Sequence, residues 1–337
     1  MKGLVIHAGV LVVAAISAFS IWSRDEADQS AKEDQSFEVW AGAPESLSSL
    51  AFEAKNRKVS LERKEDALGG YYVGLVEKED APRPDPHAPD KEPAALSKAP
   101  GKKTTVRFVS VKAGSELAEK LAPLKAVRKI GKIEGNRAAE FGFDEPQGTL
   151  KLKLGGKDHT LVIGGSTPGS REHYAKEQET GLVYAIPSDI TQMMLAAESR
   201  LVERELHGFA DEDVRRVKIT RGGKSREIVA MEDKKDAWAD ASTPDKLDET
   251  ARNWMTKVGR LRVMDYVEKP ETAPKPEDLV VRLDYFDKKK SLGFLELYRV
   301  PGEKKNYLAR TEYGRWFVTI LASAGEQVDQ DVGSLLK

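Results

Sequence analysis

The stretch that indicates the fold is HYAKEQETGLVYAI, His173–Ile186, because NYLARTEYGRWFV, Asn306–Val318, repeats its pattern. Aligned without a gap, the two segments match Tyr174 with Tyr307, Glu179 with Glu312, Gly181 with Gly314, and Val183-Tyr184 with Trp316-Phe317. In each segment apolar residues flank a glycine, which is typical of two strands joined by a turn. The match therefore predicts one closing hairpin that occurs twice.

The similarity extends upstream and downstream of this hairpin. The further matched apolar residues are Leu47, Leu50 and Phe52 with Val214, Val217 and Ile219; Leu150 and Leu152 with Val281 and Leu283; and Leu161 and Ile163 with Leu292 and Phe294. Alternating apolar residues also surround four other turns, at Asn56-Arg57, Gly222-Gly223, Gly155-Gly156 and Asp287-Lys288. Each copy should thus contain a helical lead-in, a hairpin, an aromatic strand, a helix and two further hairpins.

The predicted fold class is α+β, with two tandem duplicated units of antiparallel hairpins and packed helices. The lead-ins are expected at Pro44–Leu50 and Asp211–Val217, and the helices at residues 115–130 and 249–264. The aromatic residues Tyr174, Tyr184, Tyr307 and Trp316 are expected to pack in the core or across strands. One face of each sheet should be wet, because charged residues alternate with apolar ones.

We expect five segments along the chain. These are an N-terminal anchor at 1–24, a linker at 25–36, a first α+β repeat at 37–207, a proline-rich insertion at 79–103 inside it, and a second repeat at 208–337. The insertion combines proline with charge and has little apolar surface to bury, so it should be an extended loop or linker.

The N-terminal run Gly3–Ser23 is apolar apart from His7 and a few serines. At about 1.5 Å per residue its helix would span roughly 30 Å, the thickness of a bilayer core. Lys2 before the run favours an N-terminus inside and a body outside the cytoplasm. We predict a single-pass inner-membrane anchor with a periplasmic or extracytoplasmic body. The alternative is a cleaved signal peptide ending near Ala18-Phe19-Ser20.

Composition excludes several classes of function. The net charge is −1 and aromatic residues make up 7% of the chain, which argues against nucleic-acid binding. The absence of cysteine excludes disulfides, thiolate nucleophiles and cysteine-held metals or clusters. The Gly164–Tyr174 stretch resembles a phosphate loop but does not open a helix and lacks the Gly-Lys-Ser/Thr ending.

No catalytic, cofactor-binding or metal-ligating residue is predicted. The five histidines show no metal-ligand spacing along the chain. His173, which neighbours Glu172, is the best histidine for an enzymatic alternative, although an ordinary loop histidine explains it more simply.

All four hairpin tips carry basic residues: Lys55, Arg57, Lys58, Lys157, Arg221, Lys224, Lys288, Lys289 and Lys290. If the tips were aligned, they would form a positive rim suited to an anionic glycan, a lipid headgroup or an acidic partner. Lysine at exposed turns also simply keeps sheet edges soluble.

The segment FGFDEPQGTLKLKL, which begins at Phe141, and the later LHGFADEDV, which ends at Val214, resemble a bacterial family of unknown function numbered four-three-four-zero. Shared features include Gly142, Asp144 and Pro146, the Ile163–Gly165 turn and Tyr174–Lys176. The resemblance implies an envelope protein encoded beside an ABC-type transporter of the gliding-motility kind, with a membrane-anchored auxiliary subunit. It supplies no catalytic residues.

Three hypotheses follow. The first is a non-enzymatic accessory or scaffold subunit, whose partners would be an ABC permease, its ATPase and the anchored auxiliary subunit. The second is a binding module for glycan, peptidoglycan or another anionic ligand that uses the basic tips. The third is a hydrolase built from His173 and nearby carboxylates.

Overall fold

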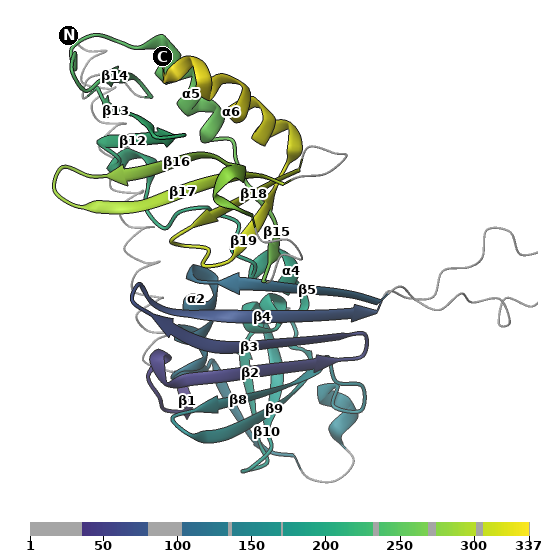
Figure 1. Cartoon of the computed structure of the whole chain (residues 1–337). Helices are drawn as coiled ribbons and strands as arrows, with labels where there is room; N and C mark the ends of the chain where they lie inside the picture. The colour runs from purple at the N-terminus through teal and green to yellow at the C-terminus, as the bar shows by residue number, and fades with distance from the viewer. Residues whose placement is uncertain are drawn as a thin grey trace, which may run out of the picture. The chain divides into compact units, whose positions relative to one another are not determined.

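The computed structural model describes residues 36–79, 103–133, 137–169, 171–231, 236–268, 274–300 and 306–336. In these ranges the chain is mostly antiparallel sheet with five α-helices, which confirms the α+β prediction (Figure 1). Two compact units are present. The first holds the chain up to Lys55 together with Leu117–Leu195, and the second holds Asn56–Glu116 and Ala196–Lys337. The boundaries of these units differ from those of the repeats predicted at 37–207 and 208–337. The duplication of the chain stays a prediction.

The first unit consists mainly of short antiparallel strands. Its elements are β1 (Phe37–Trp40), the 3-10 turn η1 (Pro44–Ser46), β2 (Leu47–Ala54), β6 (Leu124–Ala126), β7 (Arg128–Lys132), the 3-10 turn η2 (Arg137–Phe141), β8 (Gly148–Leu154), β9 (Lys157–Ser166), β10 (Glu172–Glu177), β11 (Leu182–Pro187) and α3 (Ser188–Leu195). Strands β2, β8, β9, β10, β11 and β7 are neighbours in that order, and β1 pairs with β6.

Alternation along the strands buries one face of this sheet. In β8 the leucines Leu150, Leu152 and Leu154 are buried while Lys151 and Lys153 are exposed. The turn between β8 and β9 uses Gly155 and Gly156, both at positive φ, where a side chain would be strained. At β8 one sheet face is therefore core and the other wet, as the sequence predicted, whereas β11 buries both faces at Val183–Ile186.

The second unit contains a three-stranded meander and a larger sheet. Its elements are β3 (Arg57–Asp66), β4 (Gly69–Glu79), β5 (Lys103–Ser110), α4 (Ala197–Arg200), η3 (Asp211–Asp213), β12 (Arg216–Arg221), β13 (Lys224–Ala230), β14 (Trp238–Asp240), α5 (Glu249–Val258), β15 (Val263–Val267), η4 (Pro276–Asp278), β16 (Leu279–Phe286), β17 (Ser291–Val300), β18 (Asn306–Thr311), β19 (Phe317–Ile320) and α6 (Ala322–Leu335). Helix α2 (Lys112–Leu121) begins in this unit and ends in the first.

Eight strands form the larger sheet, in the order β14-β13-β12-β16-β17-β18-β19-β15. Helices α5 and α6 lie side by side against one of its faces (Figure 1). The indole N–H of Trp254 in α5 donates to the backbone oxygen of Val328 in α6 at 3.0 Å. Because Trp254 is almost fully buried, this bond satisfies a donor that water cannot reach.

The two larger sheets share one connectivity. The order β2-β8-β9-β10-β11-β7 in the first unit corresponds to β12-β16-β17-β18-β19-β15 in the second. The aligned residues of the first hairpins agree as well, since Leu50 and Phe52 are buried like Val217 and Ile219.

The residue-by-residue match of the closing hairpins is out of phase. In β10 the alternation buries His173, Ala175 and Glu177 and leaves Tyr174 on the other face. Tyr307, in contrast, is buried in the core, and its hydroxyl donates to Asp329 of α6 at 2.9 Å. Tyr184 is buried, whereas Tyr174 and Trp316 are half-buried and contact Phe141 and Tyr266.

Both predicted helices are too long at their C-terminal ends. Helix α2 ends at Leu121, before Pro123, and α5 ends at Val258, before Gly259. Proline cannot continue a helix and glycine weakens it, so the chain turns into strands β6 and β15. The lead-ins are also shorter than predicted, because each is a 3-10 turn of three residues followed directly by a strand.

Residues 1–35 and 80–102 lie outside the described ranges, so the predicted anchor, nearly all of the linker and most of the insertion stay predictions. Among the helices of the described ranges, none has the length and apolar character needed to cross a bilayer. The ends of the insertion are described: β4 and β5 pair antiparallel, with Glu79 opposite Lys103. The insertion thus connects adjacent strand ends. It also brings with it an added strand, β5, which the sequence reasoning did not anticipate.

Candidate functional site

The nine basic tip residues differ in solvent exposure and in their ion pairs. Lys55, Lys58, Lys157, Lys224 and Lys288–Lys290 are exposed. Arg57 instead forms an ion pair with Glu198, and Arg221 pairs with the buried Asp329 at 3.6 Å. These two arginines therefore have structural partners.

Strand register separates the tips within each unit. In the first unit β2 runs antiparallel to β8, with Leu47 opposite Leu154 and Glu53 opposite Thr149. Lys157 consequently lies at one end of this strand pair and Lys55 at the other. In the second unit β12 and β16 place Arg221 and Lys288 at opposite ends in the same way. A rim that combines both tips of one unit is not formed. Whether the separate tips bind a ligand stays a prediction.

The tip at Lys288–Lys290 borders a surface depression of about 490 Å³. Its lining residues are Asp213, Arg215, Asp287, Lys288, Lys289, Lys290 and Leu292, so cations outnumber anions. The Asp287 carboxylate accepts from the backbone N–H groups of Lys289 and Lys290 at 2.6 and 2.7 Å. These bonds, that of Lys290 first, lower the pKa of Asp287 and hold the turn in shape.

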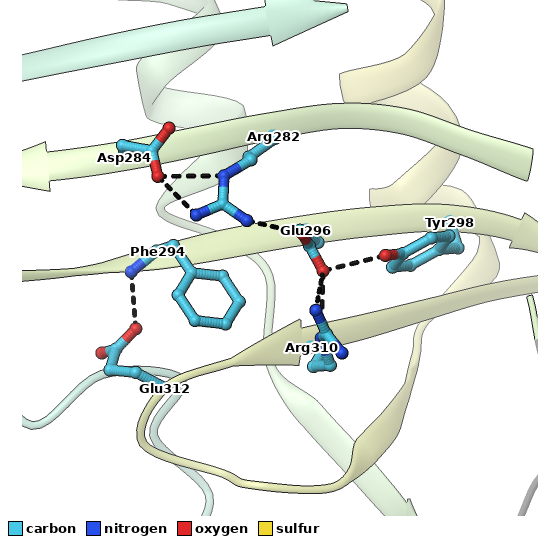
Figure 2. A network of polar contacts seen from close by, with 7 residues as sticks. All are labelled: Arg282, Asp284, Phe294, Glu296, Tyr298, Arg310 and Glu312. Carbon is cyan, nitrogen blue, oxygen red and sulfur yellow. Dashed lines mark hydrogen bonds and ion pairs between the residues drawn. The ribbon is translucent and has the colours of Figure 1, made fainter. Parts of the chain in front are cut away.

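A polar network occupies the face of the eight-stranded sheet opposite α5 and α6 (Figure 2). At its centre is Glu296 of β17, which is 6% exposed. Its carboxylate accepts from Arg282 of β16 at 2.6 Å, from Arg310 of β18 at 2.9 and 3.0 Å, and from the Tyr298 hydroxyl at 2.8 Å. Burial, followed by this contact with Glu296, raises the pKa of Tyr298 to about 12.

Aromatic rings lie beneath the arginines of the same face. The guanidinium carbon of Arg282 is 4.7 Å from the Phe294 ring centroid, and that of Arg216 is 4.2 Å from Phe286. Arg310 lies over both Phe294 and Phe317, at 5.8 and 5.9 Å. We call the group Arg216, Arg282, Phe286, Phe294, Arg310 and Phe317 the arginine–phenylalanine face. The arginine side chains remain 36–43% exposed, so they are held in place yet reachable.

His173 shows only part of a catalytic arrangement. Its Nε2 lies 3.2 Å from the Ser166 hydroxyl, and burial lowers the pKa of the imidazole. The neighbouring Glu172 contacts Arg128 at 2.7 Å and Thr167 at 3.1 Å. Nδ1 of His173 has no hydrogen-bond partner among the described residues. The third group that orients the base in a Ser–His triad is therefore not found in the described parts of the chain.

Another histidine belongs to a group that no spacing rule along the chain identifies. His159, Glu177 and Glu179 bring three ligand atoms within 4.8 Å of one another. The residues come from β9, from β10 and from the turn after β10, so only the pairing of these strands places them together. The alternation of apolar and polar residues predicted strands in both segments. It did not predict which residues of the two strands face each other, which only the structure shows.

Comparison with known families identifies the family of this chain. The model of the family described as Domain of unknown function (DUF4340) matches residues 112–280, half of the chain. The chain belongs to this family, which confirms the resemblance found in the sequence. No curated protein and no solved structure matches it.

Proposed function

We propose that this protein is a non-enzymatic accessory subunit of an ABC-type envelope machine. In this proposal residues 1–24 hold it in the inner membrane, and the body lies outside the cytoplasm. The support for the location is the apolar Gly3–Ser23 segment, long enough to cross a bilayer core. The support for the machine is the resemblance described above to envelope proteins encoded beside such transporters.

The observation that carries a binding role is the arginine–phenylalanine face. Arginine and aromatic residues are enriched at the centres of protein interfaces, where they provide most of the binding energy. Here Glu296 fixes Arg282 and Arg310 in position before any partner arrives. A pre-organised face loses less side-chain entropy on binding, which favours a partner protein as its occupant.

Co-purification from native membranes tests the proposal. The full-length chain carries a C-terminal affinity tag and is extracted in mild detergent after cross-linking in intact membranes. We expect recovery of a permease and an ATPase. In a matched chain, residues 1–24 are replaced by a cleavable signal peptide, and recovery should fall if the anchor contributes to contact. Repeated failure to recover either subunit with the anchored chain would overturn the proposal.

A second candidate is binding of an anionic glycan at the depression beside Lys288–Lys290. The excess of lysine and arginine in its lining favours this ligand. Replacing Lys288, Lys289 and Lys290 by Gln should abolish salt-sensitive retention on an anionic envelope polymer. The matched control replaces Lys55, Lys58 and Lys157 by Gln and removes the same charge elsewhere. Equal retention by both variants would exclude the depression as the site.

We also infer that the two larger sheets descend from one duplicated unit. Their common strand order supports this, as do the equivalent buried residues of β2 and β12. An experimental structure should superpose β2 and β8–β11 on β12 and β16–β19 strand for strand. A different order of neighbours in either sheet would rule the duplication out.

A further inference from the structure

The cluster of His159, Glu177 and Glu179 lies where β9 and β10 meet the turn that leads to β11. Glu177 is opposite Leu161 in the β9–β10 register, and Gln178 N–H donates to the Thr160 oxygen at 3.0 Å. His159 is two residues from Leu161 and therefore on the same sheet face as Glu177. Glu179 follows in the exposed turn.

The carboxylate of Glu177 is buried, and no cation of the described ranges forms an ion pair with it. The residue is 5% exposed, and its Oε2 accepts from the Thr180 hydroxyl at 2.5 Å. Glu179 likewise has no ion-pair partner within the described ranges, although its carboxylate lies close to that of Glu177. A buried carboxylate near a second carboxylate is costly unless a positive charge balances the pair.

The imidazole of His159 contributes a second, independent observation. Its Nδ1 is fully buried and has no hydrogen-bond partner among the described residues. A buried polar atom of this kind is usually satisfied by water or by an ion. The ring itself is held firmly, since Trp40 stacks on it with centroids 4.7 Å apart. The Trp40 indole N–H is fixed in turn by the Leu121 oxygen at 2.7 Å.

We propose that His159, Glu177 and Glu179 bind one divalent transition-metal ion of the zinc class. A neutral imidazole and two carboxylates carry a charge of −2, which a divalent cation neutralises. Imidazole with carboxylate is a donor set that Zn²⁺ accepts, whereas Ca²⁺ and Mg²⁺ prefer oxygen ligands alone. The Thr180 hydroxyl donates to Glu177 and the Trp40 ring stacks on His159. Both contacts orient the ligands, as residues around the ligands do in established metal sites. This site is independent of the partner contact proposed above.

Isothermal titration of the full-length chain with Zn²⁺ tests the site. The chain is purified in detergent without a polyhistidine tag and stripped with a chelator. We expect one Zn²⁺ per chain, bound with a Kd on the order of micromolar or tighter. Glu179→Gln, in the exposed turn, should weaken binding about tenfold or more. His159→Phe should do the same while it keeps a ring against Trp40.

Two controls separate this site from adventitious binding. His87→Asn and Glu145→Gln remove a histidine and an exposed glutamate that do not belong to the cluster, and both should bind Zn²⁺ like the unmodified chain. If His159→Phe does not fold, Glu179→Gln decides alone. Unchanged affinity in the Glu179→Gln variant, loss of binding only in His87→Asn, or equal competition by Ca²⁺ would each overturn the proposal.

Discussion

Glu296 is the residue on which the arginine–phenylalanine face depends. Replacement by Ala leaves Arg282, Arg310 and the Tyr298 hydroxyl without their common acceptor. We expect Glu296→Ala to lower the free energy of unfolding by about 2 kcal/mol, measured by urea denaturation. The arginines are partly exposed and can regain water, which keeps the loss below that of a fully buried pair.

The matched control for this change is Glu227→Ala in the same sheet. Glu227 pairs with Arg216 at 3.1 Å, and both side chains are 40% exposed. An exposed pair contributes little, so the loss should stay below about 1 kcal/mol. Equal losses for Glu296→Ala and Glu227→Ala would show that burial of Glu296 does not matter.

The ionisation of Asp240 makes the stability of the folded protein depend on pH in the acidic range. The hydroxyl of Ser242, then its backbone N–H, then Arg226 lower the pKa of Asp240 from 3.8 to about 2. The ionised form is thus favoured in the folded protein, and its stabilisation is complete above pH 4 and lost as the pH falls towards 2. Asp240→Asn should therefore be less stable than the unmodified protein at pH 7, with the difference shrinking between pH 4 and 2. A difference independent of pH would contradict this.

At the scale of single residues, the sequence predicted little of the proposed binding sites. It identified the exposed lysines at the turns, and the structure leaves those at 55, 58, 157, 224 and 288–290 exposed. It missed Glu296 and the His159 cluster, because both depend on which residues face each other across paired strands. Cross-strand register is set by turn lengths and packing, which residue spacing along one strand does not contain.

Hairpins were the elements that the sequence predicted best. Paired glycines at 155–156 and 222–223 adopt positive φ, and the alternation on either side of them gave β8, β9, β12 and β13. The error in phase between Tyr174 and Tyr307 has its origin in strand irregularities. The β16–β17 register shifts between Tyr285 and Phe286, and the β9–β10 register shifts between His173 and Ala175. Each shift adds one residue to one strand and moves the following side chains to the other face, which a gapless alignment cannot follow.

The stability of helix α5 depends on Asp248, the residue that caps its N-terminus. Asp248 caps the helix by accepting the Ala251 N–H at 2.9 Å, and it also binds Arg226. Asp248→Ala should lower the stability by about 1–2 kcal/mol, since a cap and an ion pair are lost together. Thermal unfolding followed by circular dichroism measures this. Asp245→Ala, in the exposed turn before the helix, is the control and should change stability by less than about 0.5 kcal/mol.

For the whole molecule, the α+β fold class was predictable, because hydrophobic periodicity carries that information. Strands β6, β7 and β15 were missed, since they lie wholly or partly in segments predicted as helix. The compact units were not predictable, since the division at Lys55 and Leu117 depends on which strands pair. The added strand β5 also escaped prediction. Only its first residue, Lys103, lies within the predicted insertion at 79–103, and the run from 104 to 110 was assigned to no element.

The insertion can be tested by shortening it. Residues 80–102 connect Glu79 and Lys103, which already face each other in the β4–β5 pair. Replacing them by Asn-Gly should preserve the fold and leave stability unchanged or raised by up to about 2 kcal/mol, because a shorter loop costs less entropy to close. Urea denaturation of the two chains gives the comparison. Loss of cooperative unfolding would show that the segment is part of the folded structure.

The proposed function requires that the body lies outside the cytoplasm and contacts a partner protein through the arginine–phenylalanine face. The most direct measurement is photo-cross-linking in living cells, with a photoreactive phenylalanine analogue at position 286 or 294 and, as control, at the exposed Leu68. We predict that positions 286 and 294 become linked to a subunit of an ABC-type envelope machine, and that position 68 does not. Equal yields at all three positions, or no partner at 286 and 294, would contradict the account.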